Sequence, residues 1–165
     1  RSVGRPQRLL DVRLGEAVQQ AQARRLALAP SQVRIARQPL QGIGERVGMV
    51  ASPMGWALLA ALPEAERYYL LSNVERRMPR EWPLLRRRVS EAIAQVYEKG
   101  YCSSLSEWDS GLGMVAVPVP IEGQDPRVLA CVAPSSQLSR ARVERELGPR
   151  LLGMARLLQQ AGAPE

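Results

Sequence analysis

The sequence predicts an α+β domain in which helices flank an antiparallel sheet. Two apolar, β-branched runs, Gly111–Pro120 and Val128–Pro134, are separated by the turn-forming segment Glu122–Pro126. This pattern is typical of a β-hairpin whose strands lie deep in a sheet. A polar stretch with an apolar stripe at helical spacing follows over Ser139–Gln160. Such an order of elements favours a sensory domain in which the middle of the sheet forms the floor of a small-molecule pocket.

The part of the chain before the hairpin begins with a predicted lead-in and helix over residues 1–24. Two short strands are predicted next, at Leu26–Leu28 and Val33–Ala36. Val47–Ala51 is predicted as a strand that enters a helix. That helix begins at Ser52, because serine is a preferred N-cap and the proline after it suits the first helical position.

Two more helices and a strand complete the predicted fold. Pro63–Glu66 opens a helix, because acidic residues are favoured in a first turn. Pro83–Gly100 is predicted as a long helix, and a lone strand over Tyr101–Leu105 follows it, while residues 161–165 are a tail. The apolar stripe expected on the long helix consists of Leu84, Leu85, Val89, Ile93, Val96 and Tyr97.

Size and charge limit the classes of function. The 165 residues suit a single domain, and the net charge of +7 invites a nucleic-acid-binding interpretation. Lys99 is the only lysine among 23 basic residues, so a genomic bias in composition is the simpler explanation of this charge. The run Arg86–Arg88 lies on a predicted helix, where consecutive residues point to different faces, and a solvated face is expected there.

The absence of histidine excludes Ser-His-Asp and Cys-His nucleophilic sites and most zinc sites. We therefore expect no enzyme activity, no catalytic residue, no metal ion and no cofactor. Cys102 and Cys131 are expected to be buried free thiols, as in a reducing compartment. The sequence shows neither a run long enough for a membrane span nor a secretory signal, which predicts a cytoplasmic protein without a membrane partner.

Three blocks of sequence carry a resemblance to a known family. Ile43–Ala60 resembles the "VG-x-R-(four residues)-A-(S/T)-x-x-G-x-A-LLA" segment of IclR-type transcriptional regulators. Gly100–Gly111 and Val115–Val119 are similar to that family's "GYA…E-x-x-x-G-(V/L)-x-x-(I/V)-A-x-PV". The blocks keep the family's order and spacing. The resemblance implies an effector-binding domain over residues 25–160, with a GAF-like or profilin-like antiparallel sheet of about six strands flanked by helices.

For function, the resemblance implies the ligand-sensing and oligomerisation domain of a bacterial transcriptional regulator. A small organic acid effector would modulate DNA binding by an attached helix-turn-helix domain. We expect the family's N-terminal winged helix-turn-helix to be absent from this chain, so that DNA is contacted only through that missing domain. A homodimer or homotetramer is also implied. The alternatives are a stand-alone GAF-like small-molecule sensor module coupled to a signalling enzyme and, on net charge alone, a basic nucleic-acid-binding protein.

The resemblance further places an effector pocket at the start of the helix after Ser52. Backbone N–H groups at a helix N-terminus can hold a carboxylate. The family's pair of amides falls on Pro53 and Met54, but proline has no N–H to donate. The side chains at the family's ligand-contacting positions are those of Ser104, Met114, Cys131 and Ala133, and Val47 and Leu112 form the apolar wall of the pocket.

This lining predicts the class of effector. Family members that sense small keto acids tend to carry Asp, Cys and two Ser at the four polar positions, whereas this chain carries one Ser, one Met, one Cys and one Ala. Apolar, polarisable surface thus replaces most hydrogen-bonding groups. We expect an aromatic or aliphatic carboxylate rather than glyoxylate or pyruvate. Core packing is the alternative for Met114, Cys131 and Ala133, and Trp108 is a candidate lid over the pocket mouth.

Overall fold

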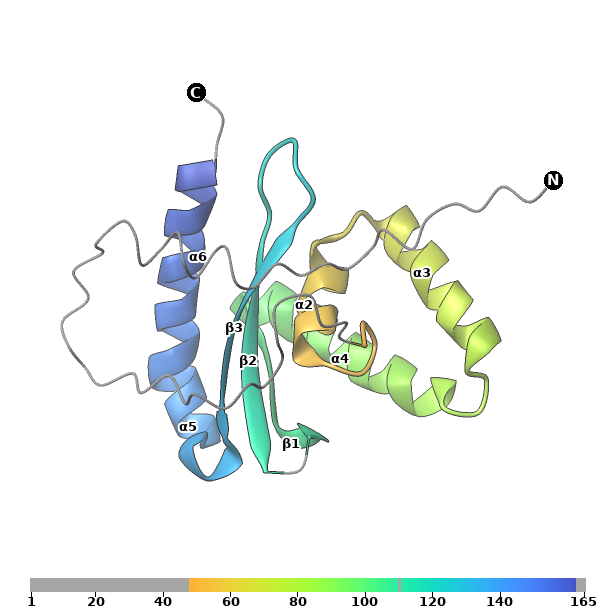
Figure 1. Cartoon of the computed structure of the whole chain (residues 1–165), viewed down its shortest axis with the longest axis horizontal. Coiled ribbons are helices and arrows are strands. Elements are labelled where there is room, and N and C mark those ends of the chain that lie inside the picture. Colours follow the sequence, from red (N-terminus) through yellow and green to blue (C-terminus); the bar gives the residue numbers. More distant parts are fainter. Residues whose placement is uncertain (1–47, 110, 163–165) are drawn as a thin grey trace. The chain divides into compact units, whose positions relative to one another are not determined.

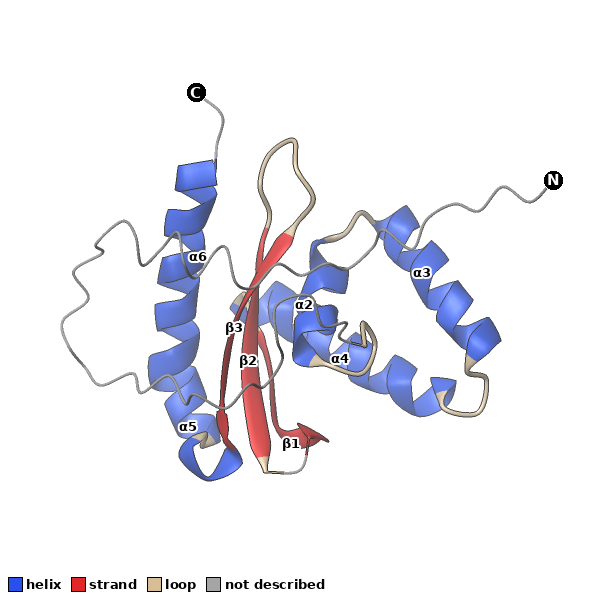
Figure 2. Cartoon of the chain, viewed as in Figure 1, coloured by secondary structure: helices blue, strands red, loops and turns tan. Residues whose placement is uncertain are grey.

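The computed structural model describes residues 48–109 and 111–162, and this part contains an antiparallel sheet flanked by helices (Figure 1 and Figure 2). The predicted fold class is therefore confirmed, while the elements predicted before Gly48 lie outside the described residues. The elements in chain order are α2 (Pro53–Ala61), α3 (Glu64–Arg77), α4 (Trp82–Lys99), β1 (Cys102–Asp109), β2 (Leu112–Val119), β3 (Arg127–Pro134), the 3-10 turn η1 (Ser135–Gln137), α5 (Arg140–Arg142), the π-helical segment η2 (Val143–Leu147) and α6 (Gly148–Gly162).

Within the described residues the sheet has three strands in the order β1-β2-β3, with β2 in the centre and both pairings antiparallel. The predicted hairpin is thus confirmed as β2 and β3. The lone strand predicted at Tyr101–Leu105 is longer and pairs with β2 as β1. In the register, Val115 lies between Ser103 and Cys131, and Met114 lies between Ser104 and Val132. Because side chains alternate along a strand, these two rows point to opposite faces.

Helix α6 covers one face of the sheet, and α2 lies against the other (Figure 1). The core under α6 joins Val115 and Val117 of β2 to Leu151 of α6. On the other side, Leu59 of α2 is fully buried, and seven further residues of that nine-residue helix are buried. A helix that is apolar all round belongs in a protein interior. The sheet is therefore buried on both faces at β2, which explains the uninterrupted apolar run of that strand.

The strand predicted at Val47–Ala51 is wrong over its described part, because Gly48–Ala51 forms a turn. The Ala51 N–H donates to the Gly48 carbonyl oxygen at 3.2 Å. The Ser52 hydroxyl donates to the same oxygen at 3.0 Å and accepts from the Gly55 N–H at 3.2 Å. The N-cap side chain thus draws the preceding backbone back toward the helix, which an extended strand does not allow.

Replacing Ser52 by alanine is expected to lower the free energy of unfolding by about 1–2 kcal/mol, since the buried hydroxyl makes both of these hydrogen bonds. Ser139→Ala is the matched control, because Ser139 caps α5 with a bond to the Arg142 N–H but is exposed. We expect that substitution to cost less than half as much in urea denaturation. Equal losses would show that burial adds nothing to the cap at Ser52.

The buried residues of α4 differ from the predicted stripe. Trp82, Val89 and Val96 are buried at heptad spacing, whereas Leu84 is 48% exposed and Tyr97 65% exposed. Leu84 lies two positions after Trp82, which is more than half a turn around the helix. Helix α3 contains no buried residue. The helix pair therefore presents more apolar surface than its sequence pattern predicts.

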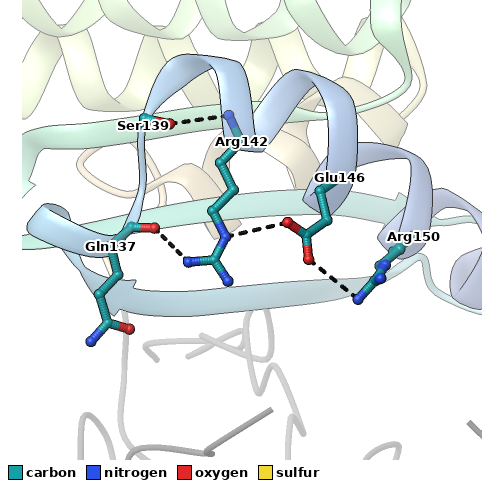
Figure 3. A network of polar contacts seen from close by, with 5 residues as sticks. All are labelled: Gln137, Ser139, Arg142, Glu146 and Arg150. Atoms are coloured by element: carbon teal, nitrogen blue, oxygen red, sulfur yellow. Dashed lines mark hydrogen bonds and ion pairs between the residues drawn. The ribbon is translucent and has the colours of Figure 1, made fainter. Parts of the chain in front are cut away.

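The C-terminal helix is predicted as one element and is found as three. The Gly148 N–H donates to the Val143 carbonyl, a π-type bond that closes η2. Proline at position 149 explains this segment, because proline has no N–H for the helical ladder and its ring crowds the carbonyl four residues earlier. Around this segment Arg142 donates to the Gln137 carbonyl at 2.9 Å and pairs with Glu146 at 3.5 Å (Figure 3).

Candidate functional site

The first turn of α2 leaves one backbone donor for a ligand. Pro53 has no N–H, and the Gly55 N–H is taken by the Ser52 hydroxyl at 3.2 Å. The Trp56 N–H donates to the Ser52 carbonyl at 3.0 Å. Among the hydrogen bonds of the described residues, none uses the Met54 N–H. The pair of amides implied by the resemblance is thus a single amide in this chain.

Cys102 of β1 connects the first turn of α2 to the sheet. Its thiol donates to the Pro53 carbonyl oxygen at 3.4 Å, and the contact is buried. In the register Cys102 lies opposite Ala116, and the next pair on the same face is Ser104 with Met114. All four side chains are at most 2% exposed. The start of α2 and the Ser104–Met114 pair therefore lie on the same side of the sheet.

Of the other predicted strand residues, Leu112 is the first residue of β2; it shares the face of Met114, two positions away, and is half-buried. Cys131 and Ala133 lie on the opposite face. They pair with Val115 and Gly113 and pack against the core under α6. The predicted lining residues are therefore not all brought together, because Cys131 and Ala133 lie on the sheet face opposite to that of Met114.

The β3 side chains that lie beside Met114 and Ala116 on the same face are Val132 and Ala130, their partners in the register. A shift of one residue along a strand exchanges its two faces, so the positions next to Cys131 and Ala133 share the face of Met114. Val47 lies outside the described residues, and so does the side chain of Trp108.

Electrostatics make the two cysteines poor nucleophiles. Burial raises the pKa of the Cys102 thiol to about 12, and a backbone hydrogen bond offsets part of this effect. Burial also raises the pKa of Cys131, and the positive charge of Arg142 acts in the opposite direction. Both side chains are thus protonated at neutral pH and serve as small polarisable groups.

Among the described residues, no group of three or more His, Cys, Asp or Glu side chains is arranged to hold a metal ion. No helix in the same residues has the length and apolar character needed to cross a membrane.

Comparison with known proteins extends these observations. A family model described as "Bacterial transcriptional regulator IclR C-terminal" matches residues 30–160. An IclR family transcriptional regulator from Brucella abortus is 36% identical with a TM-score of 0.70, over 73% of this chain and 46% of that one, so this chain spans about half its length. The C-terminal domain of the E. coli transcriptional regulator KdgR is 26% identical with a TM-score of 0.58, over 74% and 75% of the two chains.

A more distant structure shares the fold. It is a double mutant of the inducer-binding domain of PobR from Acinetobacter, in complex with 3-hydroxybenzoic acid. The identity is 20% and the TM-score 0.53, over 72% of this chain and 69% of that one. The search of curated proteins gives no match.

Proposed function

Because this chain belongs to the family of the C-terminal domain of IclR-type bacterial transcriptional regulators, we propose that it binds a small organic acid effector. Effector binding would modulate DNA binding by an attached helix-turn-helix domain, by favouring one homodimeric or homotetrameric arrangement. We expect the protein to act in the cytoplasm and to have no catalytic activity. Family membership favours this role over that of a sensor module coupled to a signalling enzyme.

The observation that carries the proposal is the Met54 N–H at the start of α2, on the side of the sheet that carries Ser104 and Met114. An amide in a first helical turn attracts a carboxylate through its hydrogen and through the helix dipole. The Cys102–Pro53 hydrogen bond holds this turn against the sheet. An anionic group at Met54 would therefore place the rest of an effector over the strand side chains.

Those side chains determine the class of effector. The face below the turn carries Met114 and Ala116 of β2 and Ala130 and Val132 of β3, all without charge. Apolar burial contributes about 25 cal/mol per Å², so an aromatic ring that buries roughly 150 Å² contributes about 4 kcal/mol. A three-carbon keto acid has little such surface and only one amide to hold its carboxylate. The proposed effector is accordingly an aromatic or aliphatic carboxylate.

Thermal-shift measurements on the full chain test this proposal. We expect 3-hydroxybenzoate and hexanoate to raise the melting temperature in a concentration-dependent way, because ligands of the folded state stabilise it by mass action. Pyruvate and glyoxylate at the same concentrations are expected to leave it unchanged. 3-Hydroxybenzoate is included because the PobR domain, which shares the fold, is bound to it. Equal or stronger stabilisation by pyruvate would contradict the apolar lining.

Two alanine variants locate the bound acid. Ala130→Leu adds volume on the face of Met114, whereas the control Ala133→Leu adds the same volume on the face under α6. We expect the first variant to bind the stabilising acid about tenfold more weakly, and the second to bind it within about twofold of the original chain. The reverse order in calorimetric titrations would place the effector on the α6 face.

A further inference from the structure

A hollow of about 250 Å³ lies between α3 and α4. Figure 1 shows these two helices diverging from the short turn that joins them. None of the candidate effector residues lines the hollow. Its volume is below the roughly 300–1,000 Å³ typical of sites for drug-sized ligands, so it suits a smaller molecule.

Each helix turns one stripe of side chains toward this hollow. The stripe of α3 consists of Tyr68, Leu71, Ser72 and Glu75. That of α4 consists of Trp82, Arg86, Val89, Ser90 and Ile93. Both sets follow the three- and four-residue spacing of a single helix face. Facing stripes of this kind normally interdigitate, with helix axes about 8–10 Å apart. Here they enclose space, and α3 buries no residue completely.

The chemistry of the hollow changes along its length. Since α3 and α4 run away from a common turn, Glu75 and Arg86 lie at the turn end together with Trp82, while Tyr68 and Ile93 lie at the far end. The turn end thus carries one carboxylate and one guanidinium, and the middle and far end are mostly apolar. The hollow has a zwitterionic end and an apolar end.

The two charges at the turn end are open to a ligand. Among the described residues, neither Glu75 nor Arg86 forms an ion pair within 4.0 Å, and no hydrogen bond of their side chains is found there. The neighbouring Arg87, by contrast, pairs with Glu91 at 3.8 Å on the exposed side of α4. A purely anionic or purely cationic ligand would leave one of the two charges without a partner.

We propose that this hollow, the α3–α4 site, binds a free α-amino acid with an apolar side chain. The amino-acid carboxylate pairs with the Arg86 guanidinium, which presents two parallel N–H donors, and the ammonium group pairs with the Glu75 carboxylate. The apolar side chain then lies beside Leu71 and Val89, in the space between the two helices. Elsewhere Arg67 of α3 already bridges to α4, with a hydrogen bond of 2.8 Å to the Tyr97 hydroxyl. Binding there fixes α3 against α4.

Calorimetric titration of the full chain with L-phenylalanine and L-leucine tests this site. We expect both amino acids to bind. Two analogues each lack one charge, 3-phenylpropionate the ammonium and phenethylamine the carboxylate. Each is expected to bind the α3–α4 site at least about tenfold more weakly than L-phenylalanine, because one charge-assisted hydrogen-bonding group is lost. Absence of binding by both amino acids at millimolar concentrations would overturn the proposal.

Matched arginine variants separate this site from the turn at Met54. Arg86→Gln is expected to weaken L-phenylalanine binding about tenfold, whereas Arg87→Gln leaves it within about twofold. Neither variant is expected to change the binding of 3-hydroxybenzoate, so failure of the effector proposal does not affect this comparison. Equal losses of L-phenylalanine affinity in the two variants would overturn the assignment. It would also be overturned if Arg86→Gln changed the oligomeric state and did not weaken binding.

Discussion

Replacing Gly55 by alanine is expected to lower the free energy of unfolding by about 2–4 kcal/mol. An added Cβ would overlap the Met49 carbonyl group, which is backbone and has no rotamer to adopt instead. The turn at Gly48–Ala51 and the first turn of α2 must therefore separate. Because Met54 directly precedes Gly55, we also expect the variant to lose affinity for the stabilising carboxylate. Urea denaturation and calorimetric titration measure the two effects.

Gly153→Ala is the matched control for this prediction. Gly153 lies within α6, and a Cβ added there would meet nothing within 4 Å apart from its chain neighbours and the backbone of its own helix. Alanine favours a helix interior over glycine by about 0.5–1 kcal/mol, so this variant is expected to be more stable than the original chain. A similar loss of stability in both variants would show that helical glycine in general, and not the approach of Met49, is responsible.

Local signals in the sequence predict the elements well where the interactions are local. Ser52 followed by Pro53 marks the start of α2, and the Ser52 hydroxyl caps the Gly55 N–H as this pair predicts. Gly100 ends α4 with φ of 83°, a left-handed conformation that glycine adopts without strain. The hairpin follows from two apolar runs and the turn residues between them. These features depend on residues within a few positions of each other.

The candidate site depends on contacts between distant segments, and here the sequence is less informative. Which face of β3 lies with Met114 depends on the register of the sheet, and a shift of one residue exchanges Cys131 for Val132. The Cys102 thiol is recognisable as buried from its strand, but its hydrogen bond to Pro53 joins residues 49 positions apart. Short-range patterns do not contain such a pairing.

The exposed residues of α3 and α4 also show that sequence patterns do not determine contacts between distant segments. Tyr97 belongs to the apolar stripe predicted for α4, yet it is 65% exposed, and Tyr68 of α3 is 74% exposed. Periodicity gives the side of a helix that is apolar, but packing decides which part of that side is covered. The hollow between the two helices arises because their facing stripes do not meet, which no single-helix pattern reveals.

Raising the pH from 9 to 12 is expected to destabilise the fold through Cys102. Burial raises the pKa of its thiol from an ordinary 9.0 to about 12, so the unfolded chain loses this proton first. Between these values the folded state holds more protons, and the free energy of unfolding falls by up to about 1.4 kcal/mol per pH unit. The stabilisation is complete below pH 9 and is lost as the pH approaches 12.

Cys102→Ser isolates this contribution, because a serine hydroxyl does not titrate in this range and can still donate to the Pro53 carbonyl oxygen. Every other ionisable group is common to the two proteins, so its contribution cancels in the difference. Urea denaturation at intervals from pH 8 to pH 10.5 is expected to show the original chain losing about 2 kcal/mol more than the variant by the last point. Parallel pH curves would show that the thiol is ionised in the fold, and hence that water reaches the contact between β1 and the first turn of α2.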